Sequence, residues 1–136
     1  MEFTELVSRL CLRPGLWVLP PYFSSVCAFI RGYDHARDGG PLTGFREWLV
    51  VRADRGDNLT WEGLVKILIM PGDALNEPLA ADREESCLKG LASLFEEFFR
   101  FREEQGITKV HYDYARWLLR KRWYTGPLRK KREDSV

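Results

Sequence analysis

Residues 82–106 read DREESCLKGLASLFEEFFRFREEQG and carry the clearest structural pattern in the chain. Asp82 and Glu85 have the spacing of a capping box, and Gly106 is a typical residue just beyond a helix. An α-helix of about 24 residues is about 36 Å long, so we expect this one to span the domain. Its apolar side chains recur every three or four residues, as one helical face requires: Leu88, Leu91, Phe95 and Phe98.

The same helical spacing extends along the chain on both sides of this long helix. Only residues 16–19 and 48–51 compete as strands, and neither segment alternates cleanly. The sequence therefore predicts an all-α fold, a single compact domain of five or six helices over residues 1–125, followed by a basic C-terminal tail over residues 126–136. The expected boundaries are a first helix ending before Pro14-Gly15, a second beginning at Pro20-Pro21 and ending before Gly39-Gly40, a third opening at Pro41, a fourth capped by Asn58 and a sixth capped by Thr108.

The composition is that of one packed domain. At 136 residues, the chain has the usual domain length, and 45% of its residues are hydrophobic. Its three cysteines are odd in number and widely spaced, which argues against a disulfide framework or a zinc site and favours a reducing compartment. The start of the chain is unlike a signal peptide, and the longest apolar run is too short to span a membrane. We expect a soluble, cytoplasmic protein without membrane association.

Charge is unevenly distributed, although the net charge is only +1. Residues 1–72 have eight acids and eight bases, residues 73–104 have nine acids and four bases, and residues 105–136 have three acids and nine bases. Opposite blocks of this kind indicate surfaces that complement each other or attract oppositely charged partners. The basic sixth helix therefore either complements the acidic fifth helix or presents its cations to a partner.

The candidate catalytic group is Asp34, His35 and Asp38, because a carboxylate can orient an imidazole for proton transfer. In a helix, however, residues 34 and 35 point about 100° apart. The sequence has no nucleotide-binding loop, nucleophile elbow or metal-ligand spacing. We therefore expect a helix–turn–helix corner at Gly39-Gly40, no catalytic residue, no metal and no cofactor, in a protein that is not an enzyme.

Three short segments resemble small bacterial proteins of the immunity type, which are paired with polymorphic and contact-dependent toxins. They are Arg13-Pro14-Gly15, residues 29–33 (FIRGY) and residues 44–49 (GFREWL), within a resemblance that covers roughly residues 12–72. The resemblance implies a cytosolic, non-enzymatic protein that neutralises a cognate toxin domain by covering its active site or substrate groove. It carries no residue role over to this chain. Many toxin domains of this kind degrade nucleic acids and present basic grooves, so it implies an acidic and partly aromatic docking surface.

Two acidic surfaces meet that description. We favour the helix–turn–helix corner narrowly, because its carboxylates have no partner in the sequence pattern and because loops commonly carry binding residues. The other is the outer face of the fifth helix, whose glutamates lie close in sequence to the basic sixth helix. The candidate partner-binding residues are Tyr33, Asp34, Asp38 and Glu47 at the corner, and Glu85, Glu96 and Glu103 on the helix.

The C-terminal region supports an alternative function. Cations interleaved with aromatic rings suit nucleic acid, because cations bind phosphates and flat rings stack on bases. The alternative is therefore a nucleic-acid-associated protein that uses the basic C-terminal helix and tail. Its candidate residues are Arg120, Arg122, Trp123, Arg129, Lys130, Lys131 and Arg132.

Overall fold

The computed structural model describes residues 1–70 and 80–128, and the predicted all-α fold is confirmed for them. Within these residues there are six α-helices, one short 3-10 helix and no strand. The elements in chain order are α1 (Phe3–Leu12), η1 (Pro14–Leu16), α2 (Phe23–Ala36), α3 (Phe45–Ala53), α4 (Trp61–Ile69), α5 (Ala81–Gln105) and α6 (Ile107–Arg120).

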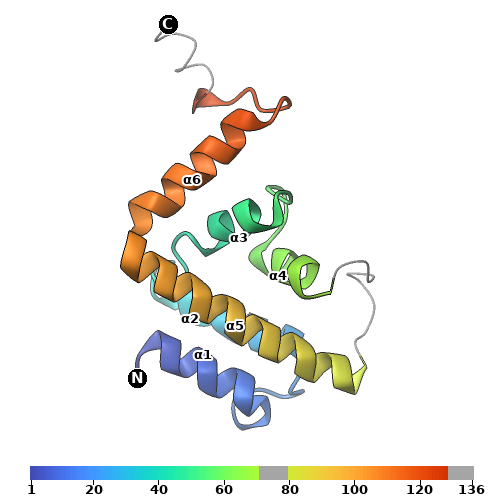
Figure 1. Cartoon of the computed structure of the whole chain (residues 1–136). Helices are drawn as coiled ribbons and strands as arrows, with labels where there is room; N and C mark the ends of the chain where they lie inside the picture. The colour runs from blue at the N-terminus through green and yellow to red at the C-terminus, as the bar shows by residue number, and fades with distance from the viewer. Residues whose placement is uncertain (71–79, 129–136) are drawn as a thin grey trace, which may run out of the picture.

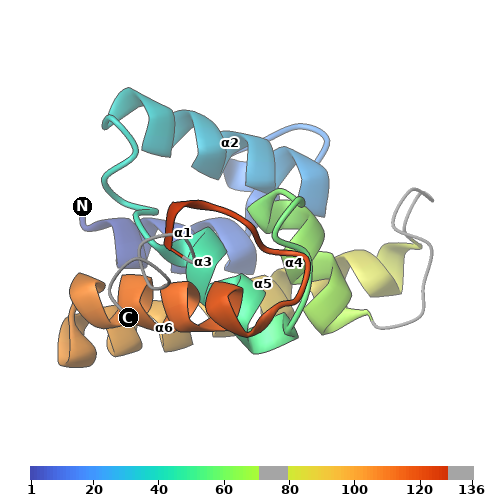
Figure 2. The same ribbon diagram turned by 90° about the horizontal axis from the view of Figure 1, so that it is seen from above.

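The long helix α5 is the central element of the fold. Figure 1 shows α1 along one side of α5 and α3 and α4 on the opposite side, with α2 behind it. Helix α6 leaves the end of α5 at a steep angle and packs mainly against α3 (Figures 1 and 2). The prediction of a long helix that spans the domain is therefore confirmed, and α6 does not run back along it.

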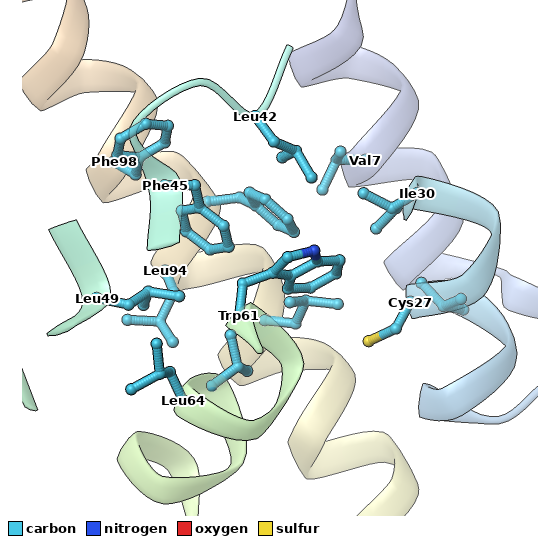
Figure 3. Close-up of a cluster of buried hydrophobic side chains, with 14 of the residues drawn as sticks. Val7, Cys27, Ile30, Leu42, Phe45, Leu49, Trp61, Leu64, Leu94 and Phe98 are labelled. Carbon is cyan, nitrogen blue, oxygen red and sulfur yellow. The ribbon is translucent and has the colours of Figure 1, made fainter. Parts of the chain in front are cut away.

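A cluster of aromatic rings joins α3, α4 and α5. Phe45 is fully buried, and its ring stacks on Phe95 with 4.4 Å between the centroids. Phe98 and Trp61 lie 5.1 Å and 5.8 Å from the same ring (Figure 3). Each such pair adds about 0.5–1.5 kcal/mol to the stability that apolar burial supplies. The apolar spacing of residues 82–105 is clear in the sequence because this face of α5 packs against both α3 and α4.

Several predicted helix starts are wrong by a few residues. Helix α2 begins at Phe23 rather than in Pro20-Pro21, and α3 begins at Phe45 rather than at Pro41. The residues before Phe45 form turns that hydrogen bonds from α2 and α5 hold in place. In each case a contact with a residue distant in the sequence determines where the helix begins. The spacing of residues along the chain could not predict that contact.

The predicted caps of the later helices also need correction. Thr60, not Asn58, caps α4, and its hydroxyl accepts a hydrogen bond from the Gly63 amide at 3.3 Å. Helix α5 begins at Ala81, and no side-chain cap bond forms at its start, so the Asp82 capping box is wrong. Helix α6 begins at Ile107 without a Thr108 cap. Gly106, with φ of 87°, ends α5 and turns the chain into α6.

Candidate functional site

The corner at residues 33–47 is a built structural turn. The Asp34 carboxylate accepts a hydrogen bond from the Leu42 amide at 2.8 Å, and Leu42 is buried. The Tyr33 ring stacks on Phe3 with 5.3 Å between the centroids, and the Arg37 guanidinium lies over the Tyr33 ring, 4.9 Å from its centroid. The Asp34 carboxylate therefore has a partner within the fold, contrary to the expectation of a free carboxylate. That Tyr33 and Asp34 bind a partner protein stays a prediction.

Arg102 of α5 ties the same corner to the core. Its guanidinium donates to the carbonyl oxygens of Pro41 and Thr43 at 2.9 Å and 3.1 Å, and it lies over the rings of Phe98 and Phe99. Burial lowers the pKa of Arg102 below its ordinary value, and the nearby Asp34 carboxylate opposes that shift. Arg102, one turn of α5 after Phe98, thus stabilises the turn before α3 through hydrogen bonds to two of its carbonyl oxygens.

The remaining corner residues do not gather into one site with Asp34. Asp38 is exposed and has φ of 57°, at the left-handed position that ends the α2 turn. Glu47 is half-buried in the first turn of α3. The His35 side chain is exposed, and among residues 1–70 and 80–128 no hydrogen bond joins it to Asp34 or Asp38. This geometry does not form the acid–base group that the three residues suggested.

The acidic side chains of α5 have two different surroundings. Glu84 accepts a hydrogen bond from the Phe23 amide at 2.6 Å and so begins α2, while Glu97 forms an ion pair with Arg52 of α3. Glu85, Glu96 and Glu103 are exposed, as predicted. Their cationic neighbours come from α5 itself: Lys89 lies 3.2 Å from Glu85, and Arg100 lies 2.9 Å from Glu96.

A groove between α1 and α5 brings two of these predicted residues together. Its volume is about 400 Å³. We call it the acidic groove, and its lining consists of Thr4, Val7 and Ser8 from α1 with Ala92, Phe95, Glu96, Phe99, Arg100 and Glu103 from α5. Apolar side chains form much of its lining, and Glu96 and Glu103 add exposed carboxylates to it. Glu85 is eleven residues before Glu96, which places it on the same side of the helix three turns away.

An exposed apolar segment, which the sequence interpretation missed, follows α1. In this apolar loop, residues 12–22, four large side chains are exposed: Leu12 by 79%, Leu16 by 74%, Leu19 by 86% and Tyr22 by 49%. The loop ends at Phe23, where Glu84 holds the chain beside the first turns of α5. The sequence signal was Leu12, which lies outside the buried stripe of α1, together with leucines placed between prolines.

Residues at the end of α6 and just after it bind the end of α3. Lys121 donates to the Asp54 carboxylate at 2.8 Å, and the Trp117 indole donates to the same oxygen at 2.7 Å. These hydrogen bonds, above all the one from Lys121, hold the pKa of Asp54 below its ordinary value. Lys109 pairs with Asp113 inside α6. These ion pairs of the described residues join α6 to itself and to the end of α3, and neither of them supports the alternative in which α6 complements the glutamates of α5.

The predicted nucleic-acid-binding residues fall into two groups. Arg120, Arg122 and Trp123 are exposed at the end of α6 and just after it, and the Trp123 ring lies 6.1 Å from that of Trp117. Arg129, Lys130, Lys131 and Arg132 lie outside the described residues. The structure therefore places three of the seven candidates, on one end of one helix.

A second hollow lies beside the N-terminus of α4, and its two arginines already donate hydrogen bonds to other groups of the protein. Arg31 donates to Glu62 at 2.7 Å, and the hydrogen bond and the charge of Glu62 raise the pKa of Arg31. Arg46 donates to the Leu59 carbonyl oxygen at 3.0 Å. Because these bonds join α2, α3 and the start of α4, we infer that both arginines stabilise the fold.

Comparison with known proteins adds no relative. No protein-family model, curated protein or solved structure matches this chain. In the part of the chain that the structure describes, no three potential metal ligands gather in one place. No helix in that part has both the length and the apolar character needed to cross a membrane. The kinship with immunity proteins therefore stays a prediction, and the surfaces described above carry the functional argument.

Proposed function

We propose that this chain is an immunity-type binding protein that neutralises a cognate toxin domain by covering its active site or substrate groove. The observation that supports this proposal most is the acidic groove with the apolar loop at the end of α1. Protein interfaces combine a few buried apolar anchors with a polar rim, and these two features supply both parts.

The apolar loop supplies the anchors. Leucine and tyrosine side chains that are 49–86% exposed leave apolar surface in contact with water. Burying such side chains against a partner releases about 1.5–3 kcal/mol for each one that becomes fully covered. Four such side chains lie within residues 12–22, and exposed apolar patches mark interaction sites on soluble proteins. The loop also lies within residues 12–72, the part of the chain that resembles immunity proteins.

The acidic groove supplies the charge that selects the partner. The carboxylates of Glu96 and Glu103 are exposed, and charges at the rim of an interface attract an oppositely charged surface during encounter. A nuclease toxin domain has a basic substrate groove, which this surface complements. We prefer docking at α1 and α5 to docking at the corner, because the Asp34 carboxylate accepts the backbone amide of Leu42 within the fold, whereas the ion pair of Glu96 with Arg100 is exposed to solvent.

The proposal is tested by capture and by neutralisation. The full chain, used as bait on extract of its native organism, should retain one basic protein domain at nanomolar affinity. Co-expression of the chain should protect a host from that domain. A variant with Leu16→Ser and Leu19→Ser should lose both properties, whereas Leu128→Ser, also at an exposed leucine but far from the loop, should keep them. A protein that retains no partner, or a double-serine variant that protects fully, contradicts the proposal.

A further inference from the structure

One side of α6 combines cations with an exposed ring. Lys109, Tyr112, Arg116 and Arg120 recur every three or four residues, so they share one face of the helix. The Tyr112 ring is 53% exposed, and the charged groups of Lys109 and Arg116 lie 5.5 Å and 5.8 Å from its centroid. Cations thus lie beside the ring and leave about half of its residue surface open to a ligand.

A second exposed ring follows at the end of the helix. Trp123 is 55% exposed, and its ring contacts Trp117 edge to face, with 6.1 Å between the centroids. Trp117 is buried, and Asp54 of α3 fixes its indole by the hydrogen bond described above. The position of Trp123 is therefore set by the packing of α6 on α3, and its exposed surface is presented to solvent from a fixed support.

The outward arginines of this region form no ion pair with a carboxylate of the described residues. Within residues 1–70 and 80–128, no ion pair is formed by Arg116, Arg120 or Arg122. By contrast, Lys109 pairs with Asp113 of the same helix, and Lys121 pairs with Asp54 at the end of α3. We call Lys109, Tyr112, Arg116, Arg120, Arg122 and Trp123 the basic face. Its geometry suits a ligand that has both repeated negative charge and flat, accessible rings.

We propose that the basic face binds single-stranded nucleic acid, with the arginines on phosphates and with Tyr112 and Trp123 stacked on unpaired bases. Stacking requires bases that are not already stacked inside a duplex, so the exposed rings favour a single strand. The run from residue 112 to residue 120 covers about 12 Å of helix, enough for a few nucleotides. This surface lies on α6, away from α1, so the inference does not depend on the proposed docking of a toxin (Figure 1).

The test uses the full chain and a fluorescently labelled oligothymidylate of about 20 nucleotides, with binding followed by fluorescence anisotropy. Neutralisation of three phosphates gives a salt slope of about −2, so raising salt from about 50 to 200 mM should weaken binding about 20-fold. Tyr112→Leu and Trp123→Leu should each weaken binding by at least about fivefold, because each removes one stacking platform. Tyr112→Phe, which keeps the ring, should bind like the wild type.

The charge variants test whether nucleic acid binds this face in particular or is attracted to any exposed cation of the protein. Arg116→Gln with Arg120→Gln should reduce the salt slope by about 1.4. The matched control is Lys89→Gln, which removes an exposed cation from α5 and should leave binding unchanged. Thermal unfolding of each variant checks that the fold is intact. No binding at about 50 mM salt, normal binding by the Leu variants, or equally tight binding of a duplex of the same length would each overturn the proposal.

Discussion

Replacing Asp34 should destabilise the fold, because its carboxylate holds the turn between α2 and α3 at the buried Leu42. Asp34 Oδ1 accepts the Leu42 amide at 2.8 Å, and the Leu42 side chain is only 8% exposed. A hydrogen bond to a charged acceptor contributes about 1.5–3 kcal/mol, and a buried amide left without an acceptor costs a similar amount. Asp34→Ala should therefore lower the free energy of unfolding by about 2 kcal/mol.

Urea unfolding followed by far-UV circular dichroism measures this difference directly. Asp34→Asn keeps an oxygen that can accept the amide, so it should lose less than Asp34→Ala. The matched control is Asp38→Asn, which removes an exposed carboxylate at φ of 57° and should change stability by at most about 0.5 kcal/mol. If Asp34→Ala unfolds at the wild-type urea concentration, the bond to Leu42 does not support the corner, and Asp34 returns to the set of free docking residues.

Three further outcomes follow from the structure. Gly44→Ala should lower the free energy of unfolding by at least about 1 kcal/mol, because φ is 85° and the new Cβ would lie 2.6 Å from Ile107 Cδ1. Gly32→Ala on α2 has open space around the new Cβ and should raise the free energy of unfolding. Paired urea titrations compare the two variants. Asp54→Asn should lower the free energy of unfolding at neutral pH, because folding lowers the pKa of Asp54 below its ordinary value of 3.8 and the charged carboxylate therefore stabilises the fold above that pH. In urea titrations, the difference in stability from wild type should shrink as the pH falls below about 3.8. A difference that does not depend on pH would refute this account. Burial raises the pKa of all three thiols, that of Cys11 to about 12, so a thiol reagent at about pH 8 should modify the native chain at least about tenfold more slowly than the unfolded chain, and equal rates would contradict this.

The all-α fold was predictable because its main signal is local. Leu88, Leu91, Phe95 and Phe98 recur at helical spacing, and the structure buries all four. The stop at Gly106 was predictable for the same reason, since a glycine with positive φ ends the helix at the expected residue. Repeated apolar spacing and helix-ending glycines can thus be recognised without knowledge of the rest of the molecule.

The role of the polar residues was less predictable, because distant contacts decide it. Asp34 and Glu84 look like free surface acids in the sequence, yet each accepts a backbone amide that begins or closes another element. The apolar loop was missed for a related reason: helical spacing identifies residues that are buried, and it assigns no meaning to leucines that lie outside the pattern. The steep departure of α6 from α5 also depends on its packing against α3, which no segment of sequence contains.

The most direct test of the account compares two charge-reversal variants in their affinity for the captured partner. Glu96→Lys with Glu103→Lys changes the acidic groove, and Asp38→Lys with Glu47→Lys changes the corner without removing Asp34. Calorimetric titration with the purified partner should show the groove variant losing at least about 2 kcal/mol of binding free energy, about 30-fold in Kd, with the corner variant near wild type. Normal binding by the groove variant together with loss of binding by the corner variant would contradict docking at α1 and α5.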